Sequence, residues 1–318
     1  MRVVLLLLLY LGILNVALEA QSSPDGVKAS IIERNLIRKY GLAGLSQRKI
    51  SRGFNLYSHA DELQMGMDAA AEIEEAGRTM SDPEINSYIN KLGMSLVVNS
   101  DARDRQFSFR VLRDDEINAM SLPNGVIYIN AGLILATENE AELASVVAHE
   151  IAHVAARHAT RNATKRGIMG AMNLSLAMFG GGIAAAIQPV AGFAEQSFLA
   201  QFSRDSEREA DLLGMEYQYL AGYDPEAFIA FLGRIEHATT KDGKWARLRA
   251  THPATGERIA QASKAIAVLL PPKAQYIEDT SDFAAFRAKV IDLTHPERKE
   301  NEEPVLLVKR PQEVQETQ

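Results

Sequence analysis

Two hydrophobic periods divide the chain into helical and extended regions. Apolar residues recur every three or four positions over 60–77, which predicts an amphipathic helix. A second helix is predicted from Ser81 onward, because Pro83 stands where the first turn of a helix accepts proline. The helical pattern returns over 138–267, and two consecutive prolines end it.

Between these helical regions, apolar residues alternate with polar ones, as is typical of half-buried strands. Strands are predicted at 107–111, 117–122 and 126–129. The last two flank Pro123-Asn124-Gly125, a strong signal for a β-hairpin, and a short helix is predicted at 132–136. The pattern therefore predicts an α+β fold that is mainly helical, with a small β-sheet next to the long helical region.

The two ends of the chain differ from its middle. Arg2 precedes an almost unbroken apolar run that ends near Ala20, which predicts a signal peptide; an uncleaved membrane anchor is the alternative. One further helix is predicted at 281–292, and the charged tail after it is expected to be partly disordered. The predicted divisions are a signal peptide, a linker, a globular domain and a C-terminal extension, at 1–20, 21–54, 55–270 and 271–318.

Composition excludes several kinds of chemistry. The 318 residues are 47% hydrophobic, which is enough for a sizeable core, and none is cysteine. Disulfides, cysteine–zinc sites and thiol nucleophiles are therefore excluded. The formal net charge of −7 argues against a nucleic-acid partner. A metal ion would have to be held by His, Asp or Glu, and three of the seven histidines lie close together: His149, His153 and His158.

His149 and His153 belong to an H-E-x-x-H motif in an apolar helical segment. Residues four apart on a helix share a face, so both imidazoles can bind one metal ion. Glu150 lies about 100° further round the helix, beside the place for a metal-bound water, and is predicted to be the general base. Thr137 and Glu140 have the pattern of a capping box at the start of this helix.

A third metal ligand is expected from a second helix. His158 is five residues past His153, about 140° round the helix, so it is expected to point elsewhere. Glu207 and Asp211 are four apart and share a face, so one carboxylate can bind the metal while the other accepts a hydrogen bond from a ligating histidine. Spacing alone does not separate Glu207 from Glu209, and a solvated charged helix face is the alternative.

Two strings in the sequence strongly resemble the BepA- and HtpX-like zinc metallopeptidases, a family that includes the CAAX prenyl proteases: HEIAHVAARH and FSRDSEREADLLGMEY. The resemblance extends over roughly residues 55–268 and includes NLYSHADELQMGMDAA and NAMSLPNGVIYINAGLI. It implies one Zn²⁺ per chain, with Glu207 as the third zinc ligand and Asp211 behind the ligands. It implies no direct role for Glu209.

Thr251-His252-Pro253, followed by Arg258, is similar to an H-P-x-x-x-x-R element of that family. Pro253 places His252 on a loop at the entrance of a helix. The resemblance implies that His252 either swings onto the zinc as an inhibitory fourth ligand or donates a hydrogen bond in the transition state. A simple capping role is the alternative for His252, and Arg258 is predicted to be a structural ion-pair residue.

Two segments are candidates for substrate contact. The strand over 126–130 closely precedes the H-E-x-x-H helix, so its edge is expected to pair with an extended peptide; a strand fully paired within its sheet is the alternative. Residues 167–194 carry no charge but include three consecutive glycines. They are interpreted as a helical hairpin or lid able to touch a membrane or an unfolded substrate, with a transmembrane span as the alternative.

These features together predict a secreted or periplasmic zinc-dependent endopeptidase that hydrolyses peptide bonds with a zinc-activated water. The resemblance implies unfolded or misassembled proteins as substrates, in quality control of envelope proteins. A chaperone-like binding protein with a latched zinc site and little proteolysis is the first alternative. A membrane-embedded protease that uses both apolar segments is the second.

Overall fold

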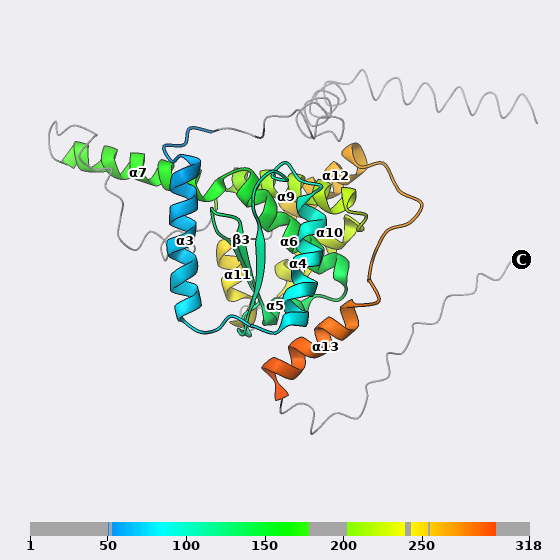
Figure 1. Ribbon diagram of the computed structural model, residues 1–318. Coiled ribbons are helices and arrows are strands. Elements are labelled where there is room, and N and C mark those ends of the chain that lie inside the picture. Colours follow the sequence, from blue (N-terminus) through cyan, green and yellow to red (C-terminus); the bar gives the residue numbers. More distant parts are fainter. Residues whose placement is uncertain (1–49, 51–52, 178–201, 239–242, 254, 297–318) are drawn as a thin grey trace, which may run out of the picture.

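The structure is a computed structural model that describes residues 50, 53–177, 202–238, 243–253 and 255–296. Its helices surround a small three-stranded β-sheet (Figure 1), which confirms the α+β class. The signal peptide predicted at 1–20 lies outside the described residues, as do most of the linker, the tail beyond 296 and residues 178–194 of the uncharged segment. None of the described helices is long and apolar enough to cross a bilayer.

Strands and helices are separated along the chain: all three strands lie between the second and third helices of the described residues. The strands are β1 (Ser108–Leu112), β2 (Ala119–Ser121) and β3 (Val126–Asn130). The first helices are α3 (His59–Glu75), α4 (Pro83–Val97), α5 (Ala131–Ala136), α6 (Glu140–Ala155) and α7 (His158–Ala177). The later ones are α9 (Arg204–Leu220), α10 (Glu226–His237), the 3₁₀ turn η3 (Gly243–Trp245), α11 (Ala246–Thr251), α12 (Gly256–Leu269) and α13 (Phe283–Thr294).

The sheet has the order β1-β3-β2, with β1 parallel and β2 antiparallel to β3. The predicted hairpin is confirmed, and its Gly125 has a φ of +91°, a conformation that side-chain-bearing residues rarely adopt. The expectation that the strand over 126–130 offers a free edge is wrong, because hairpin pairing occupies one side of β3 and β1 occupies the other. Among the described strands, the edges belong to β1 and β2.

Helix α6 forms the centre of the core. Every residue from Glu140 to Val154 is buried, and the helix packs against α4, α9 and α10. A Cβ on Gly214 of α9 would lie only 3.0 Å from the backbone of His149, so glycine at this position lets the two helices approach closely. This close packing brings the first turn of α9 near the H-E-x-x-H motif.

The start of α6 differs from the prediction. The helix begins at Glu140, and the side chain of Asn139 accepts a hydrogen bond from the backbone N–H of Glu142. The predicted capping box of Thr137 and Glu140 is therefore wrong: Thr137 ends α5, where its hydroxyl donates to the carbonyl of Ile134. Asn139 is the N-cap because it directly precedes the first turn of α6 and asparagine is a favoured N-cap residue, whereas Thr137 lies two residues further from that turn.

Helices α3 and α13 cover opposite parts of the body (Figure 1). The face of α3 that is buried carries Glu62 and Gly66, whereas its large apolar residues Leu63 and Met67 are exposed. The acidic Glu62 is buried because it pairs with arginines of the neighbouring elements. The buried side of α13, by contrast, is apolar and joins the same core as α6.

Candidate metal centre

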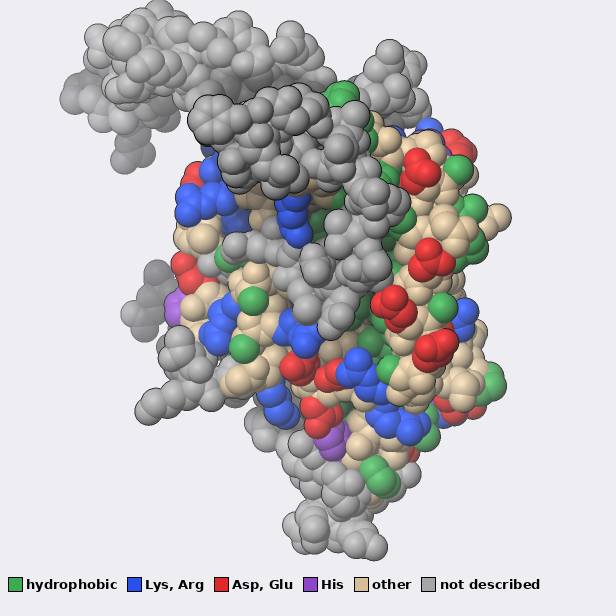
Figure 2. Space-filling model, turned by 90° about the vertical axis from the view of Figure 1, so that its left-hand side faces the viewer, with side chains coloured by type: hydrophobic (Ala, Val, Ile, Leu, Met, Phe, Trp, Pro, Cys, Tyr) green, Lys and Arg blue, Asp and Glu red, His purple; other side chains and the backbone are tan. Residues whose placement is uncertain are grey.

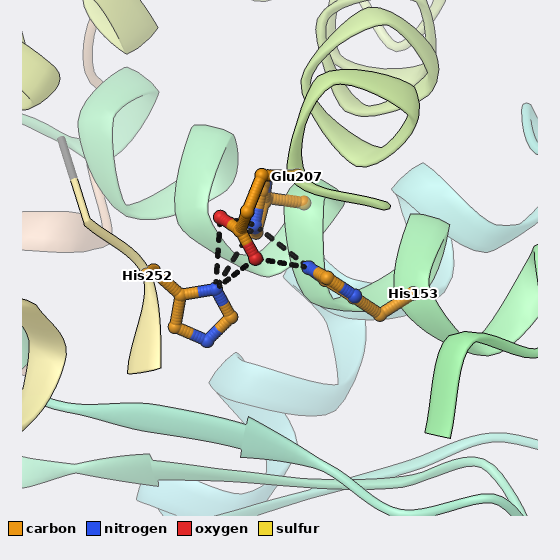
Figure 3. Close-up of side chains that lie close together, drawn as sticks. His153, Glu207 and His252 are labelled. Carbon is orange, nitrogen blue, oxygen red and sulfur yellow. Dashed lines mark hydrogen bonds and ion pairs between the residues drawn. The ribbon is translucent and has the colours of Figure 1, made fainter. Parts of the chain in front are cut away.

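Four buried side chains converge between α6, α9 and the loop before α12. They are His149, His153, Glu207 and His252, and one potential ligand atom from each lies within 4.8 Å of the others. Figure 3 shows the carboxylate of Glu207 between the rings of His153 and His252. The structure thus brings together residues that are more than 100 positions apart in the sequence.

The spacing of these atoms matches that of a zinc site. The Nε2 atoms of His149 and His153 are 2.9 Å apart, and they lie 3.6 and 3.5 Å from the carboxylate oxygens of Glu207. Ligand atoms held about 2.0–2.1 Å from a tetrahedral zinc ion would be separated by roughly 3.4 Å. Two imidazoles and one carboxylate are also a donor set that zinc prefers in proteins. The residues therefore fit this metal.

Local structure explains why Glu207 is available at this position. It lies in the first turn of α9, which is capped by the side chain of Ser203. A carboxylate is favoured there because the unpaired N–H groups of the first turn carry a partial positive charge. Its side chain is only 1% exposed.

The carboxylate of Glu150 lies beside this group rather than within it. Its Oε1 is 3.5 Å from Nε2 of His252, and its Oε2 accepts a hydrogen bond of 2.7 Å from the hydroxyl of Ser121. Ser121 belongs to β2, so the edge of the sheet directly orients this carboxylate. The sequence offered no signal for Ser121, because its relation to Glu150 depends on how the sheet packs against α6.

His252 lies close to both the metal-binding atoms and Glu150. Its Nδ1 is 3.0 Å from Oε1 of Glu207 and 3.4 Å from Nε2 of His149. It is the C-cap residue of α11, with the helix α12 starting shortly after it. Phe202 stacks against His153 at 4.1 Å between ring centroids and covers the site from another side.

Behind the ligands, Asp211 and Arg258 form a buried ion pair. The guanidinium of Arg258 donates two hydrogen bonds of 2.7 and 2.8 Å to Asp211, and it lies 3.0 Å from Oε2 of Glu207. Oδ1 of Asp211 is 3.1 Å from Nδ1 of His149. The arrangement of Glu207 and Asp211 on one face of α9 therefore places one carboxylate in front of His149 and one behind it.

These contacts set the charge of each group. Burial lowers the pKa of His149, but the carboxylates of Asp211 and Glu207 beside its ring outweigh burial and raise the pKa to about 9. Burial and the nearby His149 lower the pKa of His153 well below its ordinary value. Burial raises the pKa of Glu207 and Asp211, yet cationic neighbours outweigh it and lower both, so both are ionised. A metal bound at Nε2 of His149 would have to displace a proton.

The expectation that His158 points away from the site is wrong. Its Nδ1 lies 3.0 Å from Nδ1 of His153, and its Nε2 lies 3.2 Å from Oε2 of Glu209. The angular argument failed because the helix is not continuous: α6 ends at Ala155, and Arg157 has a φ of +57°. His158 remains outside the group of four ligand atoms.

Comparison with known proteins gives a consistent result. A model of the family described as Peptidase family M48 matches residues 83–266. The beta-barrel assembly-enhancing protease of Escherichia coli K12 is 28% identical over 245 residues, which cover 74% of this chain and 49% of that protein. The protein of the same name from Yersinia pestis is 31% identical over 210 residues, covering 63% and 43%.

A eukaryotic protein is also similar to the chain. A mitochondrial metalloendopeptidase of Schizosaccharomyces pombe is 30% identical over 239 residues, covering 73% of this chain and 67% of that protein. The chain spans about half the length of the bacterial relatives it matches.

Proposed function

The chain belongs to peptidase family M48, and from that premise we propose that it is a zinc-dependent endopeptidase. One observation carries the proposal: the buried His149, His153 and Glu207 place their ligand atoms at the spacing of a zinc site, and the carboxylate of Glu150 lies beside them. A solvated, charged helix surface does not explain this arrangement, because burying these groups without a partner would be costly.

In this proposal, one zinc ion per chain is held by Nε2 of His149, Nε2 of His153 and the carboxylate of Glu207. A bound zinc ion lowers the pKa of water to about 7 and polarises a peptide carbonyl. Glu150 accepts the proton of the attacking water and then donates it to the leaving amine. The hydrogen bond from Ser121 holds the Glu150 carboxylate in place.

The outer edge of β2 is the proposed binding site for an extended substrate. No described strand pairs with this edge, and its Ser121 contacts Glu150. A peptide that added a strand here would run past the catalytic carboxylate. A cavity of about 340 Å³, bordered by Phe202, Glu207 and Pro253, adjoins the centre and offers room for a substrate side chain.

His252 supports a second candidate function. Because its Nδ1 already lies within the group of potential ligand atoms, it can occupy the zinc position that a substrate needs. The protein would then be a chaperone-like binding protein with a latched site and little proteolysis. The same proximity allows His252 to donate a hydrogen bond to a reacting substrate from Nε2, which lies near Glu150.

The cellular role is proposed from the sequence and the relatives. Arg2 and the apolar run after it support export to the periplasm or outside the cell. The relatives' name, beta-barrel assembly-enhancing protease, supports a role in envelope protein quality control, with unfolded or misassembled proteins as substrates.

The segment 167–194 is proposed to make peripheral contact with a membrane. On the described part of the face drawn in Figure 2, acidic and basic side chains are interspersed.

Hydrolysis of unfolded casein tests the proposal. We expect the purified chain to cleave casein, a chelator to abolish cleavage, and added zinc to restore it. Glu150→Gln should bind zinc as the wild type does and lose cleavage, and undiminished cleavage by this variant would refute the mechanism. His252→Ala distinguishes the two candidates: a latched binding protein gains proteolysis when the latch is removed, whereas an enzyme that uses His252 in the transition state loses it.

A further inference from the structure

A second chain of polar contacts extends from His153 away from the metal-binding atoms. Nδ1 of His153 is 3.0 Å from Nδ1 of His158, whose Nε2 is 3.2 Å from Oε2 of Glu209. Arg161 donates a hydrogen bond of 3.1 Å to the same oxygen of Glu209. The ring of His158 is completely buried. None of these three outer residues belongs to the group that can hold a metal.

The chemistry of the groups fixes the direction of every hydrogen bond in this chain. An ionised carboxylate only accepts hydrogen bonds, so Glu209 requires an N–H on Nε2 of His158. A neutral imidazole then has an acceptor at its other nitrogen, Nδ1. This acceptor faces Nδ1 of His153, which must therefore carry the hydrogen. The lone pair of His153 is left on Nε2, the atom that faces His149 and Glu207.

A strained turn places His158 where it can make this contact. Helix α6 ends at Ala155, and Arg157 adopts the left-handed region with a φ of +57°, which is unfavourable for a residue with a Cβ. The guanidinium of Arg157 donates to Oε1 of Glu62 at 2.7 Å and to the carbonyl of Tyr57 at 2.6 Å. Contacts from the α3 side therefore hold the turn that returns His158 toward His153.

We infer that His158 and Glu209 are positioning residues for the metal centre, which hold His153 in the tautomer and ring orientation that a metal ligand needs. This inference rests on the proposed zinc site. A ligating histidine whose outer nitrogen has no hydrogen-bond partner is held neither in one tautomer nor in one ring orientation. Removing that partner typically weakens metal binding by about 10–100-fold. The structural alternative is that His158 only fills space between α7 and α9.

Three variants separate these roles. His158→Phe keeps a buried ring but removes the acceptor for His153. His158→Asn is smaller but retains an acceptor near the position of Nδ1. Tyr217→Phe is a matched control, because it also removes a hydrogen bond of a buried ring, the partly buried one from its hydroxyl to Asp101, without touching the metal centre.

The readouts are the zinc dissociation constant, from competition with a chelator, and the visible spectrum of the cobalt-substituted protein. We expect His158→Phe to bind zinc about 10–100-fold more weakly than wild type and to change the cobalt spectrum. His158→Asn should recover much of the affinity, and Tyr217→Phe should match wild type in both measurements. A space-filling role would give the opposite order, with Phe tolerated better than Asn.

Wild-type zinc affinity and an unchanged cobalt spectrum in His158→Phe would overturn the inference while leaving the proposed function intact. If wild type itself binds no zinc, the proposed function fails together with the inference. Should His158→Phe not fold, Glu209→Ala decides instead: it leaves the ring of His158 in place, and it should weaken zinc binding because the tautomer of His158 is no longer fixed. Unchanged affinity in that variant would also overturn the inference.

Discussion

His149 and His153 of α6 are both buried and both face the metal-binding group, but different residues contact the outer nitrogen of each ring. Nδ1 of His149 faces the carboxylate of Asp211 directly, whereas Nδ1 of His153 faces a second imidazole, that of His158, which in turn contacts the carboxylate of Glu209. The direct support, together with Glu207, raises the pKa of His149 to about 9, but the pKa of His153 is lowered by burial and by neighbouring histidines. One motif thus contains a histidine that holds an extra proton and one that stays neutral.

This difference shows that an H-E-x-x-H motif does not by itself define a symmetric metal site. The motif sets which side chains face the metal, and the elements packed behind it set their charge and tautomer. Here α9 supplies Asp211 behind the first histidine, and the turn into α7 supplies His158 behind the second.

The largest effect is expected on the side of His149. Asp211→Ala removes the partner of both His149 and the buried Arg258, and the loss of one member of a buried ion pair costs about 3–5 kcal/mol. Denaturant unfolding of the metal-free protein measures this cost. His158→Phe removes a neutral partner and should cost only about 1–3 kcal/mol. Equal losses of unfolding free energy in the two variants would contradict the proposed difference between Asp211 behind His149 and His158 behind His153.

A smaller effect is expected from the contacts that hold the turn before α7. Glu62→Ala removes the carboxylate that pairs with Arg157 and with Arg105, and it should reduce the free energy of unfolding by about 2–3 kcal/mol. If this turn positions His158, zinc affinity should fall as well. Glu74→Ala is a control on the same helix, since its carboxylate accepts from the hydroxyl of Tyr128, away from the centre. Loss of stability with unchanged zinc affinity would separate the turn from the metal centre.

The smallest expected effect is on the number of protons released when zinc binds, and so on the pH dependence of zinc affinity. With a pKa of about 9, His149 is protonated at pH 7 in the metal-free protein, so zinc must displace its proton. Because the pKa of His153 is lowered, that residue has no proton to release at this pH. Zinc affinity should therefore rise with pH until about 9, and the contribution of charged His149 to metal-free stability should decline over pH 6.5–9.

Calorimetry in buffers of different ionisation enthalpy counts the released protons. Asp211→Asn removes the negative charge beside His149, which lowers the pKa of this histidine. At pH 7–8 the variant should release fewer protons than wild type, by up to about one per zinc ion. Release by a zinc-bound water is common to both proteins and cancels in the difference. Equal release in both would show that Asp211 does not control the charge of His149.

Much of the fold could be predicted from the spacing of apolar residues along the chain, because helices and strands are determined mainly by residues close in sequence. The class, the hairpin at Gly125 and the helix that begins at Pro83 were confirmed. The central position of β3 did not follow, since alternation of apolar residues does not specify which strands lie beside it. In the same way, spacing along helices placed Glu207 and Asp211 on one face, and the structure puts both at the centre.

The contact between His153 and His158 was not predictable from spacing. It depends on Arg157 in the left-handed region, and that conformation is stabilised by Glu62, 95 residues earlier in the chain. Ser121 and Glu150 are likewise joined by packing of β2 against α6 rather than by any sequence pattern. Non-local contacts of this kind determine the surroundings of a motif, while local periodicity determines the motif itself.

The most direct test of the zinc centre is a crystal structure of the zinc-loaded protein, with the ion located by its anomalous scattering. The predicted result is one zinc ion bound by Nε2 of His149, Nε2 of His153 and the carboxylate of Glu207, with Nδ1 of His153 hydrogen-bonded to His158. A zinc ion bound elsewhere, or one that takes His158 or Asp211 as a ligand in place of these residues, would contradict the account.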